Sequence, residues 1–247
     1  MEANEKDESQ VANQYNGIET IWDKDDKWHW YTKEQIRKFI KKCLPNQKLK
    51  DGFIIFNAGS GGNNYSIPDD YMIHLDIADR KIKEKKRYIV GSIKNIDMKD
   101  NSVDMIICVG SVLNYCSSAT MAIKEFGRIL KPGGSIILEY ETTNSYEYKG
   151  TSSYQKSVVY NVETFYGGKA ELLNMYSQNY INTILQFNGF KTKKTKRFHI
   201  FSPCHLKNKG ITLEETNRAA NMVRWDPIAR FLTKNCSNII LLATKMG

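Results

Sequence analysis

The sequence lacks the long apolar runs of a membrane protein. None of its hydrophobic stretches approaches the length of about eighteen residues that a transmembrane helix needs. The first ten residues, MEANEKDESQ, are polar and acidic, whereas a secretory signal peptide has a basic start and an apolar centre. The sequence therefore predicts a cytoplasmic protein with no membrane partner.

Cysteine is scarce, and its spacing is not that of a metal or disulfide protein. The five cysteines are odd in number and include no C-x-x-C pair, which argues against a disulfide framework and against a zinc ribbon. We expect most of them to act as small packing residues. They are Cys43, Cys108, Cys116, Cys204 and Cys236.

Two common nucleotide-binding motifs are also missing. No G-K-[ST] follows a glycine-rich segment, so the phosphate loop of nucleoside triphosphatases is excluded. A dinucleotide-binding G-x-G-x-x-G that starts at Gly59 would need its third glycine where Asn64 stands. The sequence therefore disfavours a nicotinamide cofactor.

Composition and charge fit one ordinary globular domain over residues 1–247. Hydrophobic residues make up 41% of the chain and charged residues 26%, which is enough apolar material for a sizeable core. The net charge is +9, and two basic runs stand out, KIKEKKR at 81–87 and KTKKTKR at 191–197. Such runs can bind nucleic acid or other anions, or they can simply solvate exposed elements.

Apolar patterning predicts alternating strands and helices. We expect strands at 53–56, 71–76, 88–90, 103–109, 135–140, 190–201 and 238–245, and helices at 33–44, from Ser117 or Ser118 to 130, at 176–187 and at 212–232. This alternation indicates an α/β fold with a mostly parallel, doubly wound sheet. We expect residues 1–45 to form an N-terminal helical segment and the tyrosine-rich residues 142–175 to form an insertion or a covering element.

The first strand ends in a glycine-rich turn that suggests a ligand site. Gly59, Gly61 and Gly62 leave the main chain bare at the carboxyl end of a strand, where ligands of parallel sheets collect. Asp76 ends the next strand, and a carboxylate there can accept hydrogen bonds from both hydroxyls of a ribose. Ile77 and Ile93 could sandwich an adenine. A tight turn without a ligand remains the alternative.

Four segments in order carry a family resemblance: FNAGSGG, HLDIAD, IKNIDMKDNSVDMIICVGSVLNY and FGRILKPGGSIILEY. Together they resemble the class I S-adenosylmethionine-dependent methyltransferases, in particular the small-molecule branch. The resemblance covers residues 53–140. It implies a Rossmann-like sheet of seven strands with helices on both faces and an antiparallel last strand. It also implies S-adenosylmethionine as cofactor and S-adenosylhomocysteine as product.

The resemblance also implies a cofactor site, with Tyr15 as a lid residue before the first strand. Three positions depart from the family pattern: Asn57 replaces a carboxylate, Asn63 a glycine and Ser92 an acid near the adenine. Each replacement removes a charge or a bare backbone position and could weaken cofactor binding. The residues that the resemblance assigns to the cofactor are Tyr15, Asn57, Ala58, Gly59, Ser60, Gly61, Asp76, Ile77, Ser92, Ile93, Val109 and Gly110.

The acceptor is expected to be a small molecule, methylated on oxygen or nitrogen. Methyl transfer from a sulfonium mainly requires alignment in a dry pocket, so a general base is optional. The candidate catalytic residues are Tyr115 and His199. Glu139, Tyr140 and His205 are further candidates for a general base. A structural role is favoured for each of the five: a half-buried aromatic for the tyrosines, a capping acid for Glu139 and a hydrogen-bonded scaffold residue for each histidine.

Three other acceptor classes fit less well. Base N-methyltransferases commonly carry the motif [DNS]-P-P-[YFW] after the fourth strand, where this chain has CVGSVLNY. Cytosine-C5 methyltransferases need a Pro-Cys pair at the same place, and none occurs there. A metal-dependent catechol-type site needs a cluster of acidic residues near this strand, which is also missing. No metal is therefore expected. Two alternatives stay open: an RNA methyltransferase that uses the basic surface, and a cofactor-binding member without catalysis.

Overall fold

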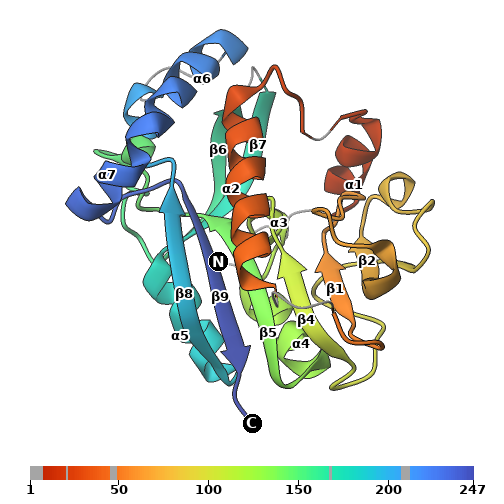
Figure 1. Ribbon diagram of the computed structural model, residues 1–247. Helices are drawn as coiled ribbons and strands as arrows, with labels where there is room; N and C mark the ends of the chain where they lie inside the picture. Colours follow the sequence, from red (N-terminus) through yellow and green to blue (C-terminus); the bar gives the residue numbers. More distant parts are fainter. Residues whose placement is uncertain (1–7, 21, 45–48, 167–168, 207–211) are drawn as a thin grey trace.

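The computed structural model describes residues 8–20, 22–44, 49–166, 169–206 and 212–247 (Figure 1). Its main sheet has seven strands in the order β3-β2-β1-β4-β5-β9-β8, and β9 runs antiparallel to both of its neighbours. The remaining pairs are parallel, so the predicted Rossmann-like fold is confirmed. The strands are β1 (Ile55–Ala58), β2 (Met72–Asp76), β3 (Tyr88–Val90), β4 (Val103–Cys108), β5 (Leu130–Glu141), β8 (Phe190–Phe198) and β9 (Asn238–Lys245).

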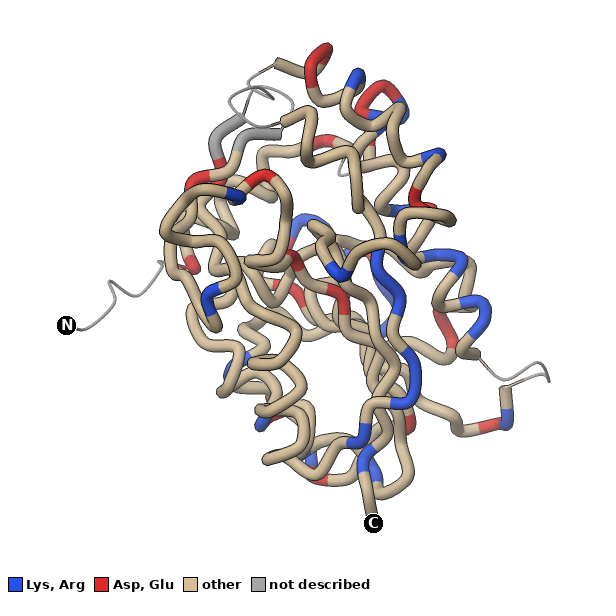
Figure 2. Tube along the Cα trace, turned by 90° about the vertical axis from the view of Figure 1, so that its left-hand side faces the viewer, with Lys and Arg blue, Asp and Glu red and all other residues tan. Residues whose placement is uncertain are grey.

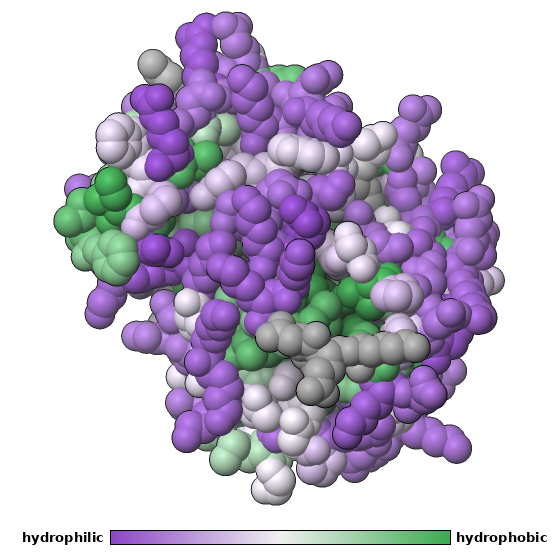
Figure 3. Space-filling view, in the orientation of Figure 1, coloured by the Kyte–Doolittle hydropathy of each residue, from purple (hydrophilic) through white to green (hydrophobic). Residues whose placement is uncertain are grey.

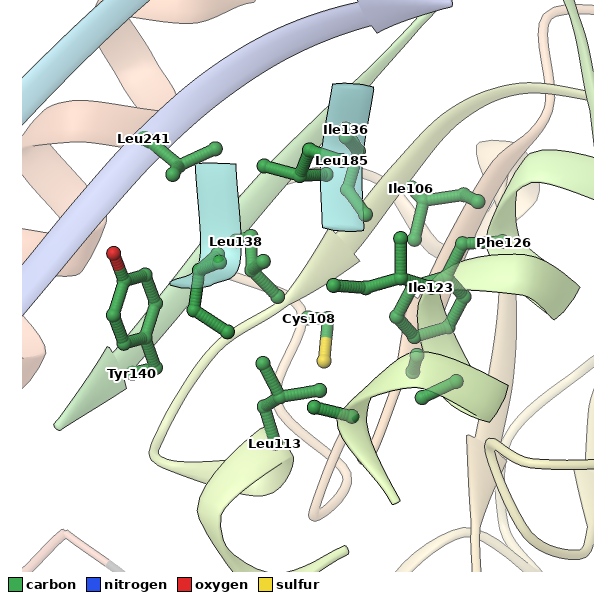
Figure 4. Packing of buried hydrophobic residues seen from close by; sticks show 14 of the residues in the cluster. Ile106, Cys108, Leu113, Ile123, Phe126, Ile136, Leu138, Tyr140, Leu185 and Leu241 are labelled. Atoms are coloured by element: carbon green, nitrogen blue, oxygen red, sulfur yellow. The ribbon is translucent and has the colours of Figure 1, made fainter. Parts of the chain in front are cut away.

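Helices cover both faces of this sheet. In Figure 1, α2 (Lys27–Cys43) crosses in front of the strands, whereas α4 (Ala119–Ile129) and α5 (Gln178–Phe187) lie behind them. Neighbouring residues of a strand point to opposite faces, so Ile107 joins the α2 side and Ile106 joins the other side. Figure 4 shows the second layer, in which Phe126 of α4 and Leu185 of α5 pack on the strands.

The N-terminal helices differ from the sequence-based expectation. Helix α2 begins six residues before the predicted Lys33, because Asp26 caps its first turn by accepting a hydrogen bond from the His29 N–H at 3.0 Å. The expected inward face is present, with Ile36, Phe39 and Ile40 buried. A separate helix, α1 (Glu8–Gly17), was not predicted, since it buries only Val11 fully and has little apolar patterning.

Helix α4 agrees with the predicted cap. The Ser118 hydroxyl accepts from the Met121 N–H at 3.3 Å, and the helix ends at Ile129, just before K-P-G-G. Strand β5 nevertheless starts at Leu130 rather than at the predicted Ser135, because Leu130 already pairs with Val103 of β4. A short helix, α3 (Val112–Tyr115), follows β4 and was not predicted.

The segment 142–175 contains a hairpin that the sequence did not reveal. Strands β6 (Val158–Tyr166) and β7 (Lys169–Tyr176) form a separate antiparallel sheet. Tyr176 therefore ends a strand and does not begin a helix; α5 starts at Gln178, where the Ser177 hydroxyl accepts from the Tyr180 N–H at 3.1 Å. Strand pairing across the hairpin, rather than local propensity, decides this region.

The C-terminal helical region is broken into three parts. The single predicted helix 212–232 is wrong: α6 (Leu213–Ala220), a 3₁₀ segment (Asn221–Trp225) and α7 (Asp226–Leu232) replace it. Pro227 sits in the first turn of α7, where its missing N–H costs no hydrogen bond. Apolar side chains of α7 stay exposed and form the green patch at the left of Figure 3, including Ile228, Phe231 and Leu232.

The second basic run lies on the edge strand β8, which ends at Phe198 rather than at the predicted Phe201. Lys191, Lys193 and Lys194 are exposed there, and the blue stretches of Figure 2 follow this strand. Charged edge strands oppose pairing with other chains, which supports the solvation reading of this run. Among the described helices, none combines the length and the apolar character that crossing a membrane requires.

Candidate functional site

A cavity of about 400 Å³ opens at the carboxyl ends of β1, β2 and β4. This position is where ligands of open parallel sheets bind. Its walls also come from α1, from the start of α2 and from β7, so segments far apart in the chain enclose it. The residues expected at the site that do line it are Tyr15, Gly59, Ser60, Gly61, Asp76, Ile77, Ser92, Ile93, Val109, Gly110 and Tyr115.

The glycine turn is tied to the neighbouring strand through its backbone. The N–H groups of Gly59 and Ser60 both donate to the Leu75 carbonyl, at 2.8 and 3.0 Å. The side chains of two expected residues serve the scaffold instead of the cavity wall. Asn57 is buried and donates from Nδ2 to the Asn63 carbonyl at 2.7 Å, and Ala58 is fully enclosed in β1.

Gly59 is required by the protein itself rather than by a ligand. A Cβ at this position would lie 2.4 Å from both Cγ atoms of Val112, and its φ of +66° is unfavourable for other residues. A side chain at Gly59 would therefore clash with Val112 before it could reach into the cavity. The bare backbone of Gly59 allows β1 to turn beneath α3.

Asp76 is a buried carboxylate at the wall of the cavity. Its Oδ2 accepts from the Gly61 N–H at 2.7 Å, and its Oδ1 accepts from the Ala78 N–H at 2.9 Å. Burial raises its pKa above the ordinary value, against the opposing effect of these hydrogen bonds. Each oxygen keeps a second lone pair, so Asp76 can still accept hydrogen bonds from a ligand.

Glu139, on β5, shapes the turn that follows β4. It is fully buried, and its Oε2 accepts from the N–H groups of Gly110 and Ser111, both at 2.8 Å, while its Oε1 accepts from Asn238 Nδ2 at 2.8 Å. Burial raises the pKa of Glu139 to about 7 despite these donors. Glu139 is thus the capping acid that its position suggested.

Two tyrosines and two carboxylates meet at the other end of the cavity. The rings of Tyr15 and Tyr115 pack edge to face with centroids 5.4 Å apart. The Tyr115 hydroxyl donates to Glu171 Oε2 at 3.2 Å, and Glu141 Oε1 accepts from Ser111 Oγ at 2.8 Å. Burial, followed by the nearby Tyr15 and Glu171, raises the pKa of Tyr115 well above its ordinary value. Tyr115 therefore acts as a hydrogen-bond donor near neutral pH.

The N-terminal segment covers the cavity with aromatic side chains. Trp22 lies against Gly110, and its buried Nε1 has no hydrogen-bond partner among the described residues. His29 Nδ1 lies 2.6 Å from Asp26 Oδ2; burial lowers the pKa of His29, but Asp26, with smaller contributions from Glu141 and Glu171, raises it overall. Trp30 lines a separate recess and not this cavity.

His199 does not join these residues. It is fully buried, stacked on Trp28 at 3.8 Å between ring centroids, and its two ring nitrogens lie 3.1 Å from Ser202 Oγ and 3.0 Å from Thr32 Oγ1. Burial lowers its pKa to about 3. Both ring nitrogens are within hydrogen-bond distance of buried hydroxyl groups, and His199 is not among the residues that line the cavity.

Two buried asparagines attach the hairpin to the sheet. Asn114 donates to the Glu141 and Asn174 carbonyls at 3.0 and 2.7 Å and accepts from the Glu141 N–H at 2.8 Å. Asn174 donates to the Cys116 carbonyl at 2.9 Å and accepts from the Asn161 N–H at 3.0 Å. These bonds fix where β7 places Glu171 relative to Tyr115.

Replacing Asn114 by alanine should destabilise the protein. The change leaves two carbonyls and one N–H of the buried junction without this partner, and we expect a loss of about 2 kcal/mol in the free energy of unfolding. Urea denaturation of the variant measures this loss. Asn179→Ala, on an exposed position of α5, is the control. Equal stability of the two variants would show that the junction does not depend on Asn114.

Several cavity residues were not singled out as site residues from the sequence. Glu141, Glu171, Trp22 and His29 line the cavity, yet no motif marks them. The tyrosine-rich composition of 142–175 was the available signal for Glu171, and it pointed only to a region. Among the described residues, no three His, Cys, Asp or Glu side chains are arranged to hold a metal ion.

Comparison with known proteins supports a methyltransferase fold around this cavity. Residues 61–138 match the family described as "Methyltransferase domain". Among solved structures, a SAM-dependent methyltransferase of Thermotoga maritima, a possible histamine N-methyltransferase, has a TM-score of 0.58 at 18% identity, with 96% of each chain covered.

Two curated relatives match shorter stretches. An uncharacterized protein of Methanocaldococcus jannaschii is 30% identical over 115 residues, which are 44% of this chain and 49% of that protein. The malonyl-[acyl-carrier protein] O-methyltransferase of Yersinia pestis is 31% identical over 97 residues, 35% of this chain and 36% of its own. The chain thus spans half or less of the length of these relatives. Residues 61–138 are thus similar to a methyltransferase domain, and the sheet has the fold of S-adenosylmethionine-dependent methyltransferases.

Proposed function

We propose that this protein transfers a methyl group from S-adenosylmethionine to an oxygen or nitrogen atom of a small molecule bound in the cavity. The observation that carries the proposal is that one cavity contains both the residues expected to bind the methyl donor and a pair of tyrosines suited to an acceptor. Gly61 and Asp76 lie at the end expected to hold the donor, and Tyr15 and Tyr115 lie at the other end. S-adenosylmethionine, when bound, supplies a methyl group activated by its positive sulfonium.

The residues present fit the nucleoside part of this donor. Asp76 can accept hydrogen bonds from ribose hydroxyls, since each of its oxygens has used only one lone pair on the backbone. Ile77 and Ile93 line the same wall and offer apolar contact for an adenine. Trp22 Nε1 is a buried donor without a described partner, and it could bind an acceptor atom of the cofactor.

The cover over the cavity favours a small acceptor. We propose that the segment 1–45 acts as a lid, through Tyr15 and Trp22, and that the segment 142–175 covers the acceptor, through Glu171. Such walls exclude water and hold the acceptor in line with the methyl group. The lysines and arginines of the two basic runs, 81–87 and 191–197, are not among the residues that line the cavity, so the basic surface gives no direct support to an RNA acceptor.

Replacing Asp76 by alanine is expected to weaken cofactor binding. Loss of a charged hydrogen-bond acceptor should cost about 1 to 3 kcal/mol of binding free energy. Isothermal titration calorimetry with S-adenosylhomocysteine measures the change. Asp70→Ala is a suitable control, because Asp70 is an exposed carboxylate near the other end of β2 whose partner is the exposed Lys86. Unchanged affinity in Asp76→Ala would remove Asp76 from the site.

Turnover separates an enzyme from a binding protein. We expect the protein to bind S-adenosylhomocysteine. We also expect it to convert S-adenosylmethionine to S-adenosylhomocysteine when a suitable acceptor from a panel of small alcohols, phenols and amines is added. Binding without turnover across the panel would favour a non-catalytic member. Turnover only with RNA, falling steeply with salt, would favour the basic-surface alternative.

A further inference from the structure

The cavity is acidic although the chain as a whole is basic. No lysine or arginine occurs among the described residues that line it, whereas the net charge of the chain is +9. A wall of one charge sign selects ligands of the opposite sign. The carboxylates that line the cavity are Glu8, Asp23, Asp26, Asp76, Glu141 and Glu171.

Three of these carboxylates either lie beside a basic side chain or belong to the proposed donor end. Glu8 pairs with Lys94 at 3.2 Å, Asp26 pairs with His29, and Asp76 belongs to the proposed donor end. Glu171 has described hydrogen bonds only from uncharged groups, Gln14 Nε2 at 2.6 Å and the Tyr115 hydroxyl at 3.2 Å. These contacts orient the carboxylate without neutralising its charge.

Glu171 and Glu141 line the same end of the cavity, because they accept hydrogen bonds from Tyr115 and Ser111, which lie at the two ends of the short helix α3. Burial raises the pKa of Tyr15 above its ordinary value, and the charges of Glu171, Asp76 and Glu141 raise it further. Both glutamates also add to the raised pKa of His29. Their fields therefore overlap at the two-tyrosine end, where the Tyr15 and Tyr115 rings offer an aromatic wall.

We propose that the acceptor is an amine, which enters this end of the cavity as an ammonium ion between Glu171 and Glu141 and against the rings of Tyr15 and Tyr115. This inference rests on the proposed function and narrows its acceptor class. Charge-assisted hydrogen bonds and cation–π contact both favour an ammonium group there. An acceptor with a free carboxylate, such as a malonyl group, would meet two like charges and be disfavoured.

An ammonium nitrogen has no free electron pair, so it must lose a proton before it can be methylated. Glu171 is the suitable proton acceptor, because its carboxylate is only partly buried, unlike that of Glu141, and can pass the proton on to solvent. One N–H bond of the ammonium breaks, an O–H bond forms on the Glu171 carboxylate, and the electron pair stays on nitrogen. Tyr115 cannot take this proton, since its hydroxyl already donates to Glu171.

Matched ligands of different charge test the proposal by binding alone. Two sets are titrated into protein saturated with S-adenosylhomocysteine: 2-phenylethylamine, 2-phenylethanol and 3-phenylpropionate, and the indole series tryptamine, tryptophol and 3-indolepropionate. Calorimetry should show at least one amine bound about tenfold or more tightly than its matching alcohol, which corresponds to one charged hydrogen bond. The carboxylates should bind more weakly than the alcohols.

Two variants test whether the preference for amines over alcohols depends on Glu171. Glu171→Gln should weaken amine binding about tenfold and leave alcohol binding unchanged, since only the charge is removed. Glu163→Gln is the matched control: Glu163 is exposed on the same hairpin, paired with Leu172, and points to the opposite face from Glu171. Glu141→Gln provides a second test if Glu171→Gln does not fold.

Failure of this inference is distinct from failure of the proposed function. If S-adenosylhomocysteine binds but no amine is preferred over its alcohol, or if Glu171→Gln and Glu163→Gln bind amines equally, the amine proposal is overturned and the methyltransferase proposal stands. If S-adenosylhomocysteine itself does not bind, the proposed function fails first. An amine preference that Glu171→Gln abolishes supports the proposal.

Discussion

Gly59→Val is expected to lower the stability of the folded protein by about 2 to 5 kcal/mol, the sum of overpacking and of a left-handed backbone conformation. The added Cβ would lie 2.4 Å from both Cγ atoms of Val112, and the φ of +66° is unfavourable for a β-branched residue. Neither problem can be relieved locally, because Gly59 is held by its hydrogen bond to the Leu75 carbonyl. A fall in melting temperature on the order of 10 °C would match this cost.

Gly133→Val separates the two contributions. Gly133 has a φ of +77°, yet no atom lies within 4 Å of a Cβ built at that position. It should therefore show the cost of the backbone conformation without the clash. If Gly59→Val proves as stable as Gly133→Val in thermal denaturation, β1 does not turn beneath Val112 as described.

Glu139 should make the protein less stable as the pH rises from about 5 to 8. Its pKa is about 7 when folded and 4.5 ordinarily, so between these values the unfolded chain binds fewer protons than the folded protein. The stabilisation is complete below pH 4.5 and is lost as the pH rises through 7. A shift of this size corresponds to about 3 kcal/mol, taken as an upper value.

Glu139→Gln should lack this part of the pH dependence, because its side chain does not titrate. The glutamine oxygen can still accept from Gly110 and Ser111, and the Asn238 amide can turn to present its own oxygen. Urea denaturation at pH 5 and pH 8 should therefore show a larger decline for the unmodified protein than for the variant. Parallel declines would mean that Glu139 stays ionised when buried. Glu163→Gln, which alters an exposed carboxylate, controls for general charge effects.

The secondary structure was predictable where a local pattern decides it. Residues 103–108 are apolar enough for a central strand and form β4, and Asn238–Lys245 forms β9 as expected. Prediction failed where pairing or capping decides: the hairpin of β6 and β7 depends on contacts between its own strands, and the start of α2 depends on Asp26. These segments are rich in polar residues and have little apolar periodicity, so the sequence pattern does not predict their secondary structure.

The sequence alone predicted the alternation of strands and helices and several residues at one end of the cavity. A glycine turn after one strand and Asp76 at the end of the next are local features, and parallel strands bring their carboxyl ends to one edge of the sheet. The other end of the cavity was decided only by tertiary structure. Tyr15 and Glu171 are 156 positions apart, and they line one cavity because α1 and β7 fold over the sheet. The same packing turns His199 inward, since a side chain's surroundings depend on the register and docking of whole elements, which no short stretch of sequence records.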